Sequence, residues 1–176
     1  MRDPVSRLFS RYLTWIGKVP GDEAYEFPSS ENFHVKCKNA IDVYENCFRK
    51  HSQRQCAYSG DLYSQVKLRL QESMYSIFIK DWMKVFPKNQ ILFLRFEDYV
   101  KDIPGTLKKV FSFLELHPLN KEQLDAIVRK KVSNSGKHYK EVPAMMNKTR
   151  KMLQKFYRPW VKELQSILGN EFSWDY

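Results

Sequence analysis

Hydrophobic residues recur every three or four positions along most of the chain, which is the spacing of amphipathic helices. The pattern predicts helices over residues 4–16, 64–86, 103–114, 121–130 and 149–168, and another after Ser29 and Ser30 with an apolar face from Phe33 to Phe48. Good capping residues stand at or near their beginnings, namely Asp3, Ser29, Ser30, Asp102 and Asn120. Pro87 and Gly169 follow the ends of two of them, where proline and glycine are typical terminators. The chain is therefore predicted to be mostly helical.

One apolar run breaks this helical spacing. Residues 90–96 read Gln-Ile-Leu-Phe-Leu-Arg-Phe, which is typical of a strand buried on both faces of a parallel sheet. A single strand cannot satisfy its backbone hydrogen bonds alone, so it requires neighbouring strands. The sequence thus predicts an α/β fold that is mostly helical and keeps a remnant of a parallel sheet.

The opening turn combines a cation with the start of a helix. Pro4 suits the first helical position, Arg2 stands just before it, and Ser6 and Ser10 share one helix face. An arginine and hydroxyls beside the free N–H groups of a helix N-terminus suit a bound phosphate. A capped amphipathic helix with a solvated arginine explains the same pattern, so local chemistry leaves both interpretations open.

Composition narrows the class of partner only in part. The chain has 176 residues, which suits one domain, and a net charge of +10. Such a charge favours polyanionic partners, whether nucleic acid, an anionic membrane surface or a sulfated glycan. The sequence shows no apolar run long enough to cross a membrane and no secretory signal segment.

Three ordered segments resemble the carbohydrate sulfotransferases of the Golgi lumen, enzymes that use 3′-phosphoadenosine 5′-phosphosulfate as sulfate donor. In the first segment, Arg2 and Ser10 have the spacing of the family's 3′-phosphate-binding pair. The other two segments comprise Tyr75, Trp82, Phe86-Pro87 and residues 90–98, and then Phe156-Tyr157-Arg158-Pro159 with Phe172-Ser173-Trp174. The resemblance covers nearly the whole chain and is nearest to members that sulfate chondroitin.

The resemblance implies a P-loop-like sulfotransferase fold and a glycosaminoglycan acceptor of the chondroitin or dermatan type. It also implies a Golgi location, no metal, and no nucleic acid partner beyond the nucleotide donor. Arg2 and Ser10 become ligands of the 3′-phosphate. In related heparan sulfate enzymes a loop covers the nucleotide phosphate, and Ser135, Gly136 and Lys137 stand near that place here. A solvated basic loop is the alternative for these three residues.

By the same resemblance, residues 1–176 are the C-terminal part of a single sulfotransferase domain. In the family, a loop that binds the 5′-phosphosulfate precedes the Arg-Asp-Pro element, and no similar glycine-rich loop occurs in this sequence. The family's catalytic base, its first strands and its membrane anchor also belong upstream. No catalytic residue is therefore assigned, and whether the chain is active alone stays open.

The three cysteines have two interpretations. In an oxidising lumen Cys47 and Cys56 can close a short disulfide loop, which leaves Cys37 as a thiol on an apolar helix face. A zinc site is the alternative, because His34 with Cys37 and Cys47 with His51 have tolerable ligand spacings. The lack of a Cys-x-x-Cys pair speaks against zinc.

The remaining polar residues carry weaker signals. Glu97 and Asp98 follow the predicted strand, where ligands bind in open α/β sheets, but capping or ion pairing is the more general explanation. Several basic residues either contact an acidic glycan or are solvated: Arg7, Arg11, Lys67, Arg69, Arg129, Lys130 and Lys131. Asn147-Lys148-Thr149 is an N-glycosylation sequon, meaningful if the chain enters the secretory pathway. A non-enzymatic polyanion-binding module and an inactive remnant are the rival functions.

Overall fold

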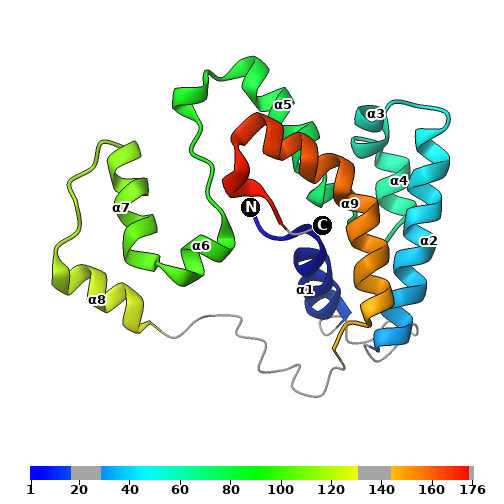
Figure 1. Cartoon of the computed structure of the whole chain (residues 1–176), viewed down its shortest axis with the longest axis horizontal. Coiled ribbons are helices and arrows are strands. Elements are labelled where there is room, and N and C mark those ends of the chain that lie inside the picture. The colour runs from blue at the N-terminus through cyan, green and yellow to red at the C-terminus, as the bar shows by residue number, and fades with distance from the viewer. Residues whose placement is uncertain (17–28, 131–143, 175–176) are drawn as a thin grey trace. The chain divides into compact units, whose positions relative to one another are not determined.

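A computed structural model describes residues 1–16, 29–130 and 144–174, and its regular elements are helices (Figure 1). The chain divides into two compact units, one of residues 1–3 and 83–140 and the other of residues 4–82 and 141–176. Within the described residues no helix has the length and apolar character needed to cross a bilayer.

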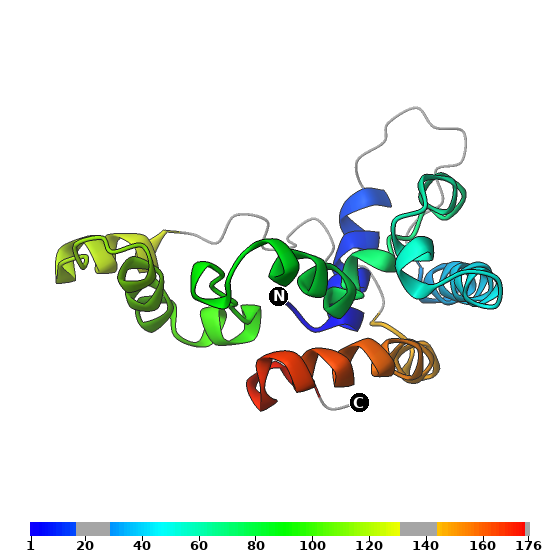
Figure 2. The ribbon, with the colours of Figure 1, turned by 90° about the horizontal axis from the view of Figure 1, so that it is seen from above.

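The larger unit contains most of the helices. They are α1 (Pro4–Ile16), α2 (Ser30–Phe48), α3 (Gln53–Ala57), α4 (Gly60–Gln65), η1 (Gln71–Ser73), most of α5 (Tyr75–Val85), α9 (Asn147–Leu168) and η4 (Asn170–Phe172). Both α1 and α2 pack against α9, as Figures 1 and 2 show from two directions. Helix α9 is thus the central support of this unit.

The core of the larger unit is built from the apolar faces of α1, α2 and α9. Its fully buried side chains include Val5, Leu8, Phe33, Cys37, Tyr44, Leu153, Tyr157 and Leu164. The rings of Tyr12 on α1 and Phe33 on α2 lie 4.8 Å apart, and those of Phe48 on α2 and Trp160 on α9 lie 5.7 Å apart. These contacts place the predicted faces of the three helices toward one another.

Several predicted boundaries are confirmed. Helix α1 spans residues 4–16 as expected, and the Ser29 hydroxyl accepts a hydrogen bond from the Asn32 N–H at 3.0 Å to begin α2. At the other end, α9 begins two residues earlier than predicted and continues through Pro159. Gly169 ends α9 with φ of +106°, a conformation that glycine adopts readily.

The predicted helix over residues 64–86 is wrong in its first half. Helix α5 begins only at Tyr75. The spacing of its apolar residues predicts that Trp82 lies on the buried face, but Trp82 is 58% exposed. Before it, Val66, Leu68 and Leu70 are buried while the residues between them are more exposed, which is the alternation of an extended segment. The polar composition of residues 49–61 predicts a turn-like connection between two helices, but they contain α3 and the beginning of α4, each capped by a serine.

The predicted strand over residues 90–96 is also not formed. Residues 91–95 are non-helical, with extended dihedral angles at Ile91 and Arg95, and they are half-buried instead of buried on both faces. Since the described residues contain no strand to pair with this segment, the expected remnant of a parallel sheet is absent from them.

The smaller unit contains η2 (Lys88–Gln90), α6 (Phe96–Lys101), α7 (Ile103–Phe113) and α8 (Lys121–Arg129). Its two predicted caps are confirmed. The Asp102 carboxylate accepts from the Gly105 N–H at 2.8 Å, and Asn120 forms a reciprocal capping box with Gln123. Few of its described residues are buried. The helical spacing over residues 103–114 predicts that Leu114 points inward, but it is 54% exposed.

Candidate functional site

The first three residues lie along the segment that leads into α6. The Met1 amino group donates to the Leu94 carbonyl, and the Phe96 N–H donates to the Met1 carbonyl at 2.6 Å. Two such bonds on either side of Arg95 are the pattern of a single parallel pairing. The pairing fixes the start of the chain beside the C-terminal end of the apolar run.

At this position Arg2 contacts Phe96, the neighbour of Glu97, and Glu97 contacts Asp3, the neighbour of Arg2. The Arg2 guanidinium carbon lies 4.9 Å from the centre of the Phe96 ring, a cation–π distance. The Glu97 carboxylate accepts from the Asp3 N–H at 2.8 Å and pairs with Arg95 Nε at 3.4 Å. Glu97 therefore has the ion-pairing role that general chemistry favours, and its bond from the Asp3 N–H holds the backbone that follows Arg2.

Ser10, the second predicted phosphate ligand, lies half-buried on α1. Its carbonyl accepts from the Thr14 hydroxyl at 2.9 Å. Arg2 belongs to the smaller unit and Ser10 to the larger, so their joint action on one phosphate stays a prediction. Ser135, Gly136 and Lys137 lie outside the described residues.

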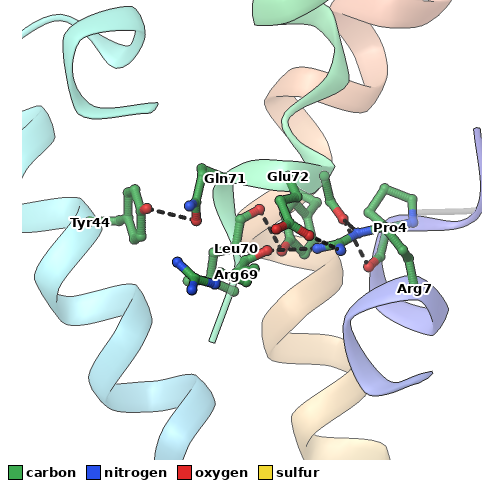
Figure 3. A network of polar contacts seen from close by, with 9 residues as sticks. Pro4, Arg7, Tyr44, Arg69, Leu70, Gln71 and Glu72 are labelled. Carbon is green, nitrogen blue, oxygen red and sulfur yellow. Dashed lines mark hydrogen bonds and ion pairs between the residues drawn. The ribbon is translucent and has the colours of Figure 1, made fainter. Parts of the chain in front are cut away.

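Arg7 holds the first turns of α1 in place (Figure 3). Its guanidinium donates to the Ser73 hydroxyl, to the Glu72 carboxylate at 2.7 Å and to the Arg69 carbonyl at 2.6 Å. Only 19% of the side chain is exposed. Both interpretations offered for Arg7, a glycan contact and a solvated side chain, are therefore replaced by a structural role, since its donors bind residues 69–73.

Two buried tyrosines extend the hydrogen-bonded framework that Arg7 forms with residues 69–73. The Tyr44 hydroxyl donates to Gln71 Oε1 at 2.8 Å, as Figure 3 shows, and the Tyr157 hydroxyl donates to the Leu70 carbonyl at 3.0 Å. Burial raises the pKa of Tyr44 to about 12 and raises the pKa of Tyr157 as well. Both phenol groups therefore stay neutral and act as hydrogen-bond donors. This behaviour fits a structural role better than a role as a proton acceptor.

In the sequence, the extended segment of this framework is indicated by apolar residues at alternate positions, Val66, Leu68 and Leu70. The basic residues Lys67 and Arg69 stand between them. The Arg69 guanidinium lies over the Tyr63 ring and donates to the Tyr63 carbonyl at 3.0 Å, so Arg69 also has a structural role.

Lys67 borders a hollow of about 200 Å³ between α2 and the extended segment after α4. Two lysines, Lys36 and Lys67, and two amides, Asn39 and Gln65, line it, and no carboxylate does. A larger hollow of about 480 Å³ between α2 and α9 is lined by Asp42 and Glu45 as well as lysines. The smaller hollow is therefore the better candidate for an anionic group.

A disulfide joins Cys47, near the end of α2, to Cys56 in α3, with Cα atoms 6.0 Å apart. This bond excludes the zinc interpretation that used the Cys47 thiolate. Cys37 is a free, buried thiol whose pKa is raised by burial. In the described part of the chain, no three His, Cys, Asp or Glu side chains are grouped as metal ligands.

The sulfotransferase domain family matches residues 1–158 of the chain. Carbohydrate sulfotransferase 15 of Homo sapiens is 36% identical over 176 residues, which cover 99% of this chain and 30% of the human protein. Carbohydrate sulfotransferase 15 of Nototodarus sloanii is 34% identical over 133 residues, which cover 74% of this chain and 83% of that protein.

A second group of relatives is more distant. Heparan sulfate glucosamine 3-O-sulfotransferase 3B1 of Mus musculus is 25% identical over 189 residues, covering 99% of this chain and 42% of the mouse protein. The chain thus spans less than half the length of the mammalian relatives it matches. The family match over most of the chain and the identity to these relatives show that it belongs to the sulfotransferases, among the carbohydrate sulfotransferases.

Proposed function

We propose that the protein takes part in sulfate transfer from 3′-phosphoadenosine 5′-phosphosulfate to a sugar hydroxyl of a glycosaminoglycan. The observation that carries this proposal is the family match over residues 1–158, together with relatives named as carbohydrate sulfotransferases. Sulfate transfer requires a held donor, neutralised charge on the leaving phosphate and deprotonation of the acceptor oxygen. The described residues suit the first of these tasks.

Donor binding is assigned to Arg2 and Ser10, with Ser135, Gly136 and Lys137 covering the nucleotide. An arginine binds a phosphate through two parallel N–H donors, and a serine hydroxyl adds a third. The parallel pairing of Met1 beside Arg95 supports this assignment, because it places Arg2 at the end of an extended segment that is followed by a helix. Ligands of open α/β folds bind at such ends.

Acceptor binding is assigned to the hollow lined by Lys36 and Lys67. Chondroitin and dermatan chains carry carboxylates and sulfates, which two ammonium groups and the amides of Asn39 and Gln65 suit. The acceptor that we favour is N-acetylgalactosamine 4-sulfate in chondroitin, modified at O6, because the sequence motifs most resemble those of enzymes for that sugar.

Residues 1–176 form, in this proposal, the C-terminal part of one sulfotransferase domain in the Golgi lumen. The apolar segment 91–95 is only half-buried, and the described residues contain no strand beside it, so it suits a place in a larger sheet. The disulfide between Cys47 and Cys56 suits an oxidising compartment. The 5′-phosphosulfate loop and the catalytic base then belong to a preceding segment.

Transfer of radiolabelled sulfate from the donor nucleotide to defined glycans tests the proposal. The full-length protein should label chondroitin sulfate and dermatan sulfate, and labelling should stop when adenosine 3′,5′-bisphosphate competes for the donor site. A protein that binds these glycans without any response to the nucleotide would be a polyanion-binding module instead.

A further inference from the structure

The sequon Asn147-Lys148-Thr149 forms the first turn of α9, and it is the one Asn-x-Ser/Thr triplet in the sequence. Its residues differ sharply in exposure. Asn147 and Lys148 are exposed, whereas Thr149 is completely buried. The acceptor residue is thus exposed, and the residue whose hydroxyl completes the sequon lies in the core.

Two hydrogen bonds tie this turn and the residues just before it to α2. The Thr149 hydroxyl lies 2.8 Å from Nδ1 of His34, and the Ser30 hydroxyl donates to the Ala144 carbonyl at 2.9 Å. Both bonds join segments more than 100 residues apart, so they form only when α2 and α9 pack. In the folded chain the Thr149 hydroxyl therefore already has a partner.

The same unit contains the disulfide between Cys47 and Cys56. Disulfides form and persist in oxidising compartments such as the lumen of the endoplasmic reticulum. N-linked glycans are attached to Asn-x-Ser/Thr sequons of secreted chains, hence in the same compartment. The disulfide is thus an observation, independent of the sequon, that supports a lumenal location for this unit.

We propose that Asn147 carries an N-linked glycan and receives it before α2 and α9 pack. The Asn147 amide nitrogen forms a bond to the anomeric carbon of a lipid-linked oligosaccharide. The bond from that carbon to the lipid pyrophosphate breaks, the lipid pyrophosphate leaves with the electron pair of that bond, and the amide gives up one proton to solvent. The transferring enzyme reads the sequon threonine, which packing withdraws into the core. The inference rests on the lumenal location in the proposed function and not on sulfate transfer itself.

Expression of the full chain behind a cleavable signal sequence in mammalian cells tests the site. Peptide N-glycosidase should increase the electrophoretic mobility of the chain and leave aspartate at position 147. Asn147→Gln and Lys148→Pro should both abolish this shift, because a central proline inactivates a sequon. Thr149→Ser, which keeps the hydroxyl, and Asn46→Gln, an exposed asparagine outside any sequon, should keep it. A disulfide-bonded lumenal chain without the shift would overturn the site.

The order of events is tested with chain made in bacteria. The oxidised, folded chain should be a poor acceptor for purified oligosaccharyltransferase, whereas the reduced, alkylated and unfolded chain should be modified at Asn147. Equal modification of both would overturn the proposed order. Nucleotide binding separates this inference from the proposed function, since Asn147→Gln should bind adenosine 3′,5′-bisphosphate normally. A wild-type protein that binds this nucleotide but carries no glycan would contradict the inference about Asn147 and leave the proposed function intact.

Discussion

Replacing Tyr157 by phenylalanine removes one buried hydroxyl and keeps the ring. The side chain is completely buried, and its hydroxyl donates to the Leu70 carbonyl at 3.0 Å. That carbonyl also accepts from the Ser73 N–H at 3.1 Å, so the substitution leaves it with one partner. We therefore expect a loss of about 0.5–1.5 kcal/mol in the free energy of unfolding, below the ~1–3 kcal/mol of a fully unsatisfied group.

Tyr157→Ala provides the contrast, since it removes the ring as well. A large aromatic side chain deleted from a core costs about 3–5 kcal/mol. Urea unfolding followed by far-ultraviolet circular dichroism measures both variants, and Tyr63→Phe is the matched control because Tyr63 is 48% exposed. The control should stay within about 0.5 kcal/mol of the wild type. If Tyr157→Phe were as mild as the control, or as harmful as Tyr157→Ala, the hydrogen-bonded framework around Leu70 would be refuted.

Three further predictions concern the cysteines and one ion pair. Cys37 should resist iodoacetamide in the folded chain, because it is buried and its pKa is raised, and should react on unfolding; labelling of native protein would contradict its burial. The Cys47→Ser, Cys56→Ser double variant should lose about 2–3 kcal/mol in urea unfolding, since the bond closes a short loop; an unchanged midpoint would count against the disulfide. For Glu163, burial raises the pKa, the hydrogen bond and charge of Lys80 at 2.5 Å act against burial, and the net pKa is lowered. This ion pair should stabilise the fold above about pH 4.5, and the stabilisation should disappear as pH falls through the lowered pKa. It should amount to less than ~1 kcal/mol, because both side chains are well exposed. Glu163→Gln should remove that acid dependence in unfolding measured from pH 7 to 3.

Local signals in the sequence predicted the helix boundaries that depend on local chemistry. Asp102, Asn120 and Ser29 each cap the helix expected of them, because a side-chain oxygen two or three residues before an N–H acts within one turn. The apolar face of α2 was also predictable from its 3.6-residue period. The similarity to carbohydrate sulfotransferases, inferred from short motifs, is confirmed at the level of the family.

The predictions failed where tertiary contacts override local pattern. Residues 66–70 alternate apolar and basic, but they stand in a longer stretch whose apolar residues also fit a helix, and the period of two was missed. The role of Arg7 depends on acceptors about 65 residues away, which no local pattern reveals. The strand predicted over 90–96 requires neighbours, and a hydrophobic run without them remains a half-buried extended segment.

Binding of two nucleotides to full-length protein tests the central claim most directly. Adenosine 3′,5′-bisphosphate carries the 3′-phosphate assigned to Arg2, and adenosine 5′-phosphate lacks it. A charge-assisted hydrogen bond contributes about 1.5–3 kcal/mol. By isothermal titration, Arg2→Ala should weaken the bisphosphate about 10-fold to 150-fold and leave the monophosphate unchanged, with Arg11→Ala, an exposed arginine of α1, as control. Equal weakening of both nucleotides, or of neither, would contradict the claim.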